Sequence, residues 1–273
     1  MIKVNSISGG KTSAFMALNY PADIELFALV CIEAEYCKPK DKGLVKYVSD
    51  KIGRDFVATA ESDKTLVVVR DLEQLLGREI KWVVGDTFDE LNRKRKSIPN
   101  RTRRFCTAQM KIHAIAKYLY KNTELPVFVN MGIRYDEKER AKVTKHEREL
   151  REKIIVGKRG ARNKWEEIFW GVANYPLLNS RTTHYEIYKW AKSSGLDFPD
   201  DSNCVGCFWK PVQQLRKNWD DYPNKMEWFA QQEEKYIANY KDDITYRSIK
   251  KIGLQTDFFF GTGSGCQAGF CTD

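Results

Sequence analysis

The chain has 273 residues, which is enough for one large domain or for one domain with an extension. Hydrophobic residues make up 42% of it, so a sizeable core is expected, yet no apolar run approaches the roughly 20 residues that span a membrane. The net charge of +9, from 46 Lys and Arg against 37 Asp and Glu, suits a polyanionic partner and equally a basic soluble surface. We expect a cytoplasmic protein with reduced cysteines, because the N-terminus leads into a strand pattern instead of a signal peptide.

The first fifteen residues predict a buried strand, a glycine turn and the start of a helix. Ile2, Val4 and Ile7 give the apolar strand pattern, and residues 14–18 give the helix. The turn would bring backbone N–H groups, hydroxyl donors and the positive end of the helix toward one point, an arrangement that binds phosphate. Asn5 stands where a Walker A loop has glycine, so this would be a different phosphate loop; an ordinary strand-to-helix turn is the alternative. The turn consists of Ser8, Gly9, Gly10, Lys11, Thr12 and Ser13.

Strand and helix patterns alternate over the next stretch. Residues 24–32 predict a buried strand of the parallel type, and 42–52 predict a helix. The β-branched run 65–69 and the run 81–84 predict two further strands.

Residues 93–104 are the most basic short stretch, and Cys106 follows them at the start of an amphipathic helix, 110–119. Most charge runs are solvated loops, and the alternative is a loop that binds an anion. Several arginines, Arg104 among them, lie next to this thiol in sequence. Such a field favours thiolate, the form that attacks sulfur or binds metal, whereas a buried structural cysteine is the competing interpretation.

A predicted strand at 127–131 ends in Gly132 and Arg134. Open α/β sheets bind ligands at the carboxyl ends of their strands, and a guanidinium there can grip phosphate or sulfate with two hydrogen bonds. Asp136 and Glu137 would orient this arginine or bind Mg²⁺. The competing interpretation is a surface arginine beside an acidic helix cap.

The second half predicts a helix over 137–152, a basic loop, and a helix over 182–192. The loop would close over substrate, contact nucleic acid or be merely solvated. Cys204 and Cys207 form a Cys-x-x-Cys turn, which is half a zinc site, a redox dithiol or a pair of structural thiols. The aromatic residues of 211–240 are expected in the core. Cys266 and Cys271 lie among glycines in the tail, which we expect to fold back onto another part of the chain.

Ser8–Ser13 resembles the PP-loop of the adenine-nucleotide alpha-hydrolase superfamily. Arg104-Phe-Cys-Thr107 with Lys111-Ile112, then Gly132–Arg140, then the Cys204–Cys207 pair are similar to motifs of its phosphoadenosine-phosphosulfate (PAPS) reductase branch, in the same order. The resemblance implies an α/β fold with a doubly wound, mostly parallel sheet. A nucleotide-binding domain would cover residues 1–178. A helical, cysteine-bearing C-terminal region, 179–273, would pack on it as one unit.

The same resemblance implies the roles of individual residues. An adenine nucleotide, either ATP or a sulfonucleotide, would be held with or without Mg²⁺ by Ser8, Gly9, Gly10, Lys11, Thr12, Ser13, Arg104, Gly132, Arg134 and Asp136. The catalytic candidates are Lys11, Cys106, Arg134 and Cys271. A [4Fe–4S] cluster, with zinc as the second choice and no metal as the third, would take its ligands from Cys106, Cys204, Cys207, Cys266 and Cys271.

The chain departs from the branch at three places. It has one cysteine where a Cys-Cys doublet is usual, it lacks the C-terminal Glu-Cys-Gly-x-His motif, and Glu33-Ala-Glu35 replaces the usual adenine-contacting sequence. Three functions therefore remain in view. The first is reduction or transfer of sulfur on a sulfonucleotide, with an electron-donor protein as partner. The second is ATP pyrophosphatase chemistry that adenylylates an acceptor such as a nucleic acid. The third is a non-catalytic nucleotide or nucleic-acid binding module with structural zinc. Homo-oligomers are compatible with all three.

Overall fold

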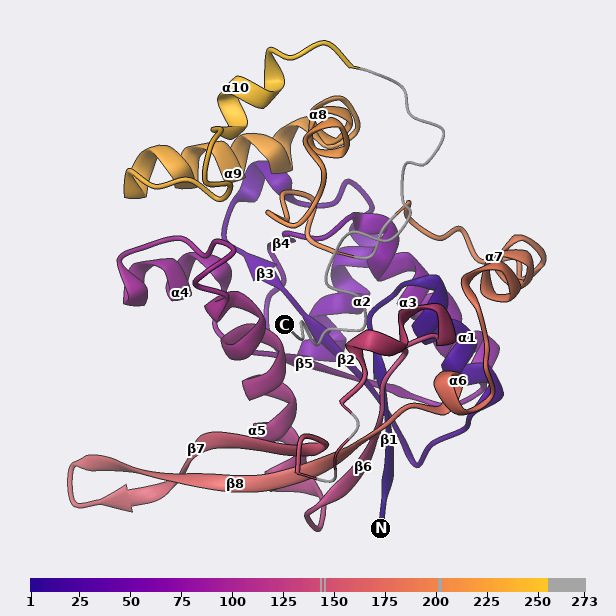
Figure 1. Ribbon diagram of the computed structural model, residues 1–273. Helices are drawn as coiled ribbons and strands as arrows, with labels where there is room; N and C mark the ends of the chain where they lie inside the picture. The colour runs from indigo at the N-terminus through magenta and orange to yellow at the C-terminus, as the bar shows by residue number, and fades with distance from the viewer. Residues whose placement is uncertain (143, 145, 201–202, 255–273) are drawn as a thin grey trace.

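The computed structural model describes residues 1–142, 144, 146–200 and 203–254. A six-stranded, mostly parallel sheet forms its centre, in the order β5-β2-β1-β6-β8-β7 (Figure 1). The first five strands run parallel, and β7 pairs antiparallel with β8. The predicted α/β class with a mostly parallel sheet is confirmed, and the arrangement is compatible with a Rossmann-like fold. The strands are β1 (Lys3–Ile7), β2 (Ile24–Leu29), β5 (Ile80–Val84), β6 (Val127–Asn130), β7 (Glu149–Arg159) and β8 (Arg162–Asn174).

The strand order reverses between β1 and β6. From β1 the chain adds β2 and β5 on one side, then returns to add β6 and β8 on the other. At such a switch point the connections leave the sheet in opposite directions and open a crevice at the carboxyl ends of the two strands. The glycine turn follows β1, and Gly132 and Arg134 follow β6, so this crevice is where the predicted nucleotide loops belong.

Helices cover both faces of the sheet because successive residues of each buried strand point to opposite sides. On β2, Phe27 and Leu29 pack with α1, α2 and α3, whereas Leu26 and Ala28 pack with α5 on the other face. These helices are α1 (Lys11–Asn19), α2 (Lys42–Ile52), α3 (Asp63–Leu76) and α5 (His113–Asn122).

The C-terminal helices share a core with the first half of the chain. Trp219, Trp228 and Phe229 lie in one buried cluster with Val30, Phe88 and other residues that precede them by more than a hundred positions. The expectation that these aromatic residues belong to the core is confirmed, and the two predicted segments, 1–178 and 179–273, are not separated into independent cores. The remaining elements are β3 (Cys31–Ile32), β4 (Ala58–Thr59), α4 (Phe88–Arg95), α6 (Pro176–Asn179), α7 (His184–Ser193), α8 (Val212–Asp221), α9 (Pro223–Tyr236) and α10 (Tyr246–Lys250), with short helical turns η1 (Glu35–Cys37), η2 (Thr107–Ile112) and η3 (Tyr135–Arg140).

Two predicted elements are wrong. The β-branched run 65–69 lies inside helix α3, which is capped by the Ser62 hydroxyl at its start and by Gly77 in the left-handed conformation at its end. These caps and a buried face with helical spacing outweigh β propensity. The predicted helix over 137–152 is instead the turn η3 followed by strand β7, and the basic loop after it forms the β7–β8 hairpin.

Within the described ranges, no helix combines the length and the apolar character needed to cross a membrane. Cys266 and Cys271 lie outside these ranges.

Candidate functional site

The loops that follow β1 and β6 are in direct contact. Asn5 and Asn130 are aligned partners in neighbouring parallel strands, so both strands end at the same edge of the sheet. A Cβ atom placed on Gly132 would lie 3.1 Å from Cγ2 of Thr12. The PP-loop-like turn and the Gly132–Arg134 segment, which the sequence could only list separately, therefore form one site.

Glycine is required at position 9 for two reasons. Its φ of +71° lies in the left-handed region, and an added Cβ would come within 2.5 Å of Cγ2 of Thr65 on helix α3. The turn then feeds directly into α1 at Lys11. The turn thus packs against α3 too closely to leave room for any side chain at position 9.

Ser13 stabilises the turn by hydrogen bonds within it. Its hydroxyl donates to the carbonyl of Gly10 at 3.0 Å and accepts the backbone N–H of Ser8 at 3.1 Å. Ser8 and Ser13 hydroxyls also lie 3.1 Å apart, and both side chains are buried. These two predicted phosphate donors thus shape the loop itself.

The N-terminus of α1 has the properties of an anion site. Gly10 is its N-cap and contributes no side-chain cap, and the first turn holds no acidic residue. The backbone N–H groups of Lys11, Thr12 and Ser13 have no acceptor within the helix, because helical hydrogen bonding starts with Ala14 donating to Gly10. Lys11 adds a cation at the same point.

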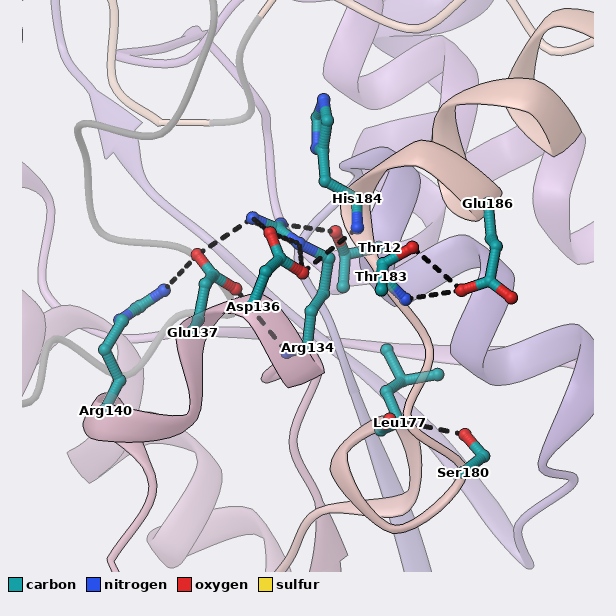
Figure 2. Close-up of polar contacts among 10 residues, drawn as sticks. All are labelled: Thr12, Arg134, Asp136, Glu137, Arg140, Leu177, Ser180, Thr183, His184 and Glu186. Atoms are coloured by element: carbon teal, nitrogen blue, oxygen red, sulfur yellow. Dashed lines mark hydrogen bonds and ion pairs between the residues drawn. The ribbon is translucent and has the colours of Figure 1, made fainter.

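The buried Arg134 is the centre of an ionic network (Figure 2). Its Nη1 donates to Oγ1 of Thr12 at 3.3 Å, its Nε donates to Asp136 at 3.3 Å, and its Nη2 lies 3.1 Å from Glu137. The Arg134 side chain is 6% exposed. Arg134 binds two carboxylates, so a phosphate would have to replace at least one of them to reach the guanidinium.

This network lowers the pKa of Asp136. Burial works against ionisation of Asp136, but Arg134 holds the pKa of this carboxyl below its usual range. Asp136 also accepts the backbone N–H of His184 at 3.0 Å. The carboxylate therefore connects the β6 loop to the start of α7.

His184 is a site residue that the sequence analysis missed. It is the first residue of α7 and lies within the capping box that Thr183 and Glu186 form. Desolvation lowers the pKa of His184, and the positive charges of Arg134 and Lys11 lower it further. The capping-box pattern could have predicted the helix start, but only the fold places it beside the PP-loop-like turn.

The three described candidate metal cysteines line one small cavity. Cys106, Cys204 and Cys207 surround a volume of about 50 Å³, together with Lys111 and Trp209. Cys106 directly precedes η2, a six-residue π-helical stretch of a kind frequent at functional sites. Burial raises the pKa of Cys106 to about 11, and burial likewise raises that of Cys204, so both are thiols in the absence of metal. Gly206 is required here because the Phe229 ring lies 2.4 Å from where its Cβ would stand.

A buried ion pair borders this cavity and was also missed. Lys111 donates to Glu61 at 2.9 Å, and the Glu61 side chain is fully buried. Burial works against the charge of Lys111, but the Glu61 carboxylate raises the pKa of this ammonium to about 12. Among the described residues, the second carboxylate oxygen of Glu61 has no hydrogen-bond partner.

Two arginines of the basic stretch contact a residue that lines the cysteine cavity. The guanidinium groups of Arg101 and Arg104 lie 5.0 and 5.3 Å from the ring centre of Trp209, which lines this cavity. Arg104, predicted to bind nucleotide, is thus placed near the thiols. Asn203 lines both this cavity and a smaller one that also includes Asp200. Lys217 lowers the pKa of Asp200, and the charge of Lys11 lowers it further.

In the described part of the chain, no set of three or more His, Cys, Asp or Glu side chains is arranged to hold a metal ion. Comparisons of the sequence with protein-family models and with curated proteins, and of the fold with solved structures, find no match.

Proposed function

We propose that the chain is an adenine-nucleotide-binding enzyme of the PP-loop type that acts on the sulfur of a sulfonucleotide, as PAPS reductase-like proteins do. The observation that carries this proposal is the contact between the uncapped start of α1 and the Gly132–Arg134 segment at the switch point of the sheet. Mostly parallel sheets bind nucleotides at this place. The fold would then be of the adenine-nucleotide alpha-hydrolase type.

The nucleotide phosphates would lie on the amides of Lys11, Thr12 and Ser13. Lys11 supplies a positive charge there, and Arg134 supplies a second when it exchanges a carboxylate for phosphate. His184, at the same edge, is neutral near pH 7 and can donate a hydrogen bond or accept a proton.

Cys106, Cys204 and Cys207 would hold an iron–sulfur cluster. Three thiols that line one cavity, with cations around them, are a donor set that suits iron and sulfur. Each iron of a four-iron cluster takes one thiolate, so three thiols at one cavity would supply three of its four ligands. Cys266 or Cys271 would supply the fourth ligand. The cluster would supply electrostatic stabilisation, and this chain's own Lys111 lies at the cavity to share that role.

The reaction would begin with a thiolate, Cys271 in our sequence analysis, attacking the sulfur of the sulfonucleotide. A sulfur–sulfur bond forms while the sulfur–oxygen bond to the phosphate breaks, and the nucleotide leaves with its phosphates intact. Two electrons from a dithiol donor protein then release sulfite and restore the thiol.

A second candidate is ATP cleavage between the α and β phosphates, with adenylylation of a nucleic-acid acceptor. The basic β7–β8 hairpin favours it.

Calorimetric titration with ATP, adenylyl sulfate and PAPS tests the proposal, with and without Mg²⁺. Lys11→Ala should weaken binding at least tenfold, since a phosphate contact to a charged group contributes about 1.5–3 kcal/mol. Lys3→Ala, a solvent-exposed lysine at the other end of β1, is the matched control and should bind normally. Sulfite release supports the first reaction and pyrophosphate release the second. No binding by any of the three nucleotides would refute both.

A further inference from the structure

A basic groove lies outside the nucleotide site, between the β7–β8 hairpin, helix α5 and the end of β5. Its volume is about 740 Å³. Four of its lining residues are cationic and one is a carboxylate, so the described lining is positively charged. These residues are Arg54, Lys94, Lys117, Lys121 and Asp86.

One row of α5 supplies much of this charge. His113, Lys117 and Lys121 are spaced four residues apart, so they lie along one side of the helix over about 12 Å. Lys117 and Lys121 are exposed, and no described carboxylate lies within ion-pair distance of either ammonium group. By contrast, Lys94 is paired with Asp86 at 2.7 Å. The charges of Lys117 and Lys121 are therefore available to a ligand, whereas His113 already contacts Glu152 at 3.3 Å.

The hairpin extends the same charge away from the body of the molecule (Figure 1). Residues 153–164 include five Lys or Arg and no Asp or Glu, and Ile154 alone among these described residues is buried. This distal part of the hairpin therefore contributes little to the core, in contrast to the β8 residues Trp170 and Ala173, which are buried in it. Packing therefore does not account for its composition, whereas binding to an anionic partner does.

Trp165 adds an aromatic surface to the groove. Its side chain is 55% exposed, and its ring centre lies 6.4 Å from that of His113 on α5. The ring lines the same groove as Lys117 and Lys121, so a stacking surface and two cations are available together. A cationic groove that carries an aromatic ring is the usual arrangement for single-stranded nucleic acid, with phosphates on the cations and a base on the ring.

We infer that this groove binds single-stranded nucleic acid. A duplex would not use the Trp165 ring in this way, because its bases are already paired and stacked. Gln109 lines the groove, while the next two residues, Met110 and Lys111, line the cysteine cavity. A bound strand would therefore lie next to the helix that carries Cys106. The inference does not rest on the proposed nucleotide chemistry, and its test contains no nucleotide.

Fluorescence anisotropy of the full chain with labelled single strands of about 12 nucleotides, within typical site sizes, tests this inference. DNA and RNA strands and the matching duplex are the three arms. Lys117→Glu/Lys121→Glu should weaken single-strand binding about tenfold or more and reduce the salt slope by about 1.4, the value for two lost phosphate contacts. Lys40→Glu/Lys42→Glu makes the same change in net charge on exposed residues outside the groove and should change affinity less than twofold.

Trp165→Ala should weaken binding about fivefold or more, whereas Trp165→Phe keeps an aromatic ring and should retain most of it. Preference for DNA or for RNA would identify the sugar that the groove selects. The inference is overturned if the control pair weakens binding as much as the groove pair, if the duplex binds as tightly as the single strand, or if Trp165→Ala has no effect.

Discussion

Arg134 and Thr12 are 122 positions apart, yet the guanidinium donates to the threonine hydroxyl at 3.3 Å. This hydrogen bond joins the loop after β6 to the first turn of α1. Because the two strands are neighbours at the switch point, the loops that follow them must meet, and the small Gly132 lets them approach closely. The candidate nucleotide site is thus a consequence of the strand order.

Gly9→Ala should abolish nucleotide binding and destabilise the fold. An alanine at positive φ costs about 1–2 kcal/mol, and here its Cβ would also strike Thr65. Gly53→Ala is the matched control, since Gly53 has a φ of +64° with nothing within 4 Å of the added Cβ. Urea unfolding should show a clearly larger loss for Gly9→Ala, and Thr65→Ser should restore part of it. Equal losses for the two glycine variants would show that the contact with Thr65 is unimportant.

Asp136→Asn should strengthen binding of a nucleotide in the absence of Mg²⁺. The change removes one of the carboxylates that neutralise Arg134 but keeps an oxygen that can accept from the His184 N–H. Affinity should rise about two- to fivefold, which corresponds to the roughly 0.4–1 kcal/mol of a partly exposed ion pair. Asp50→Asn, on an exposed residue of α2, gives the same change in charge and should have no effect. Weaker binding in the presence of Mg²⁺ alone would instead identify Asp136 as a metal ligand.

The protonation of His184 should report on nucleotide binding. Desolvation, Arg134 and Lys11 hold its pKa below the ordinary value of 6.5, and phosphate next to Lys11 should raise it. In the free protein, the unfolded chain binds more protons than the folded chain between the folded pKa and 6.5. Stability should therefore fall as the pH drops below about 6.5, and His184→Gln should remove this part of the pH dependence.

Two-dimensional NMR can follow this titration, because the chain has three histidines. His146, whose side chain is 90% exposed, is the internal control and should not respond to nucleotide. A His184 pKa that stays the same when nucleotide binds would place the phosphates elsewhere.

Anaerobic reconstitution with iron and sulfide should give a brown protein, and serine at Cys106, Cys204 or Cys207 should abolish most of its iron content. These three thiols line one cavity, whereas the buried Cys31 does not line it. Cys31→Ser is therefore the matched control and should retain iron. Serine variants of Cys266 and Cys271 would identify the fourth ligand. A colourless, zinc-containing protein would refute the cluster and favour a structural zinc site.

Local features made part of this structure predictable. The strand, the glycine turn and the helix that starts at Lys11 are adjacent in sequence, so their patterns are sufficient to predict them. The run 65–69 predicts a strand because β-branched residues favour strands, whereas the observed helix depends on caps at Ser62 and Gly77, outside this run. The sequence does not predict the β7–β8 hairpin, because the hairpin tip is exposed on both faces and has no alternation of apolar and polar residues.

Features that depend on strand register could not be predicted. Glu25, Asn5, Asn130 and Asn174 lie side by side on β2, β1, β6 and β8, and three hydrogen bonds of 2.7 to 3.0 Å join their side chains in one row. In the sequence they are four unrelated polar residues. Once the strands are aligned, the row stabilises one register below the candidate site, because a shift by one residue would separate all four side chains.

Asn130→Ala should therefore be strongly destabilising. It removes the donor to Oδ1 of the fully buried Asn5 and the acceptor of Nδ2 of the partly buried Asn174, and an unsatisfied buried polar atom costs about 1–3 kcal/mol. We expect a loss of about 2–4 kcal/mol in urea unfolding. Asn19→Ala removes a comparable hydrogen bond from the exposed end of α1 and should cost only about 0.5 kcal/mol.

A double-mutant cycle distinguishes the coupling between the asparagines of the row from the packing that each side chain loses on its own. Asn5→Ala/Asn130→Ala removes both partners of the central hydrogen bond, so its cost should be smaller than the sum of the two single variants. Strictly additive costs would mean that the asparagines stabilise the sheet independently. In that case the row would not fix the register of β1 against β6, and the alignment of the two loops would depend on the apolar packing around them.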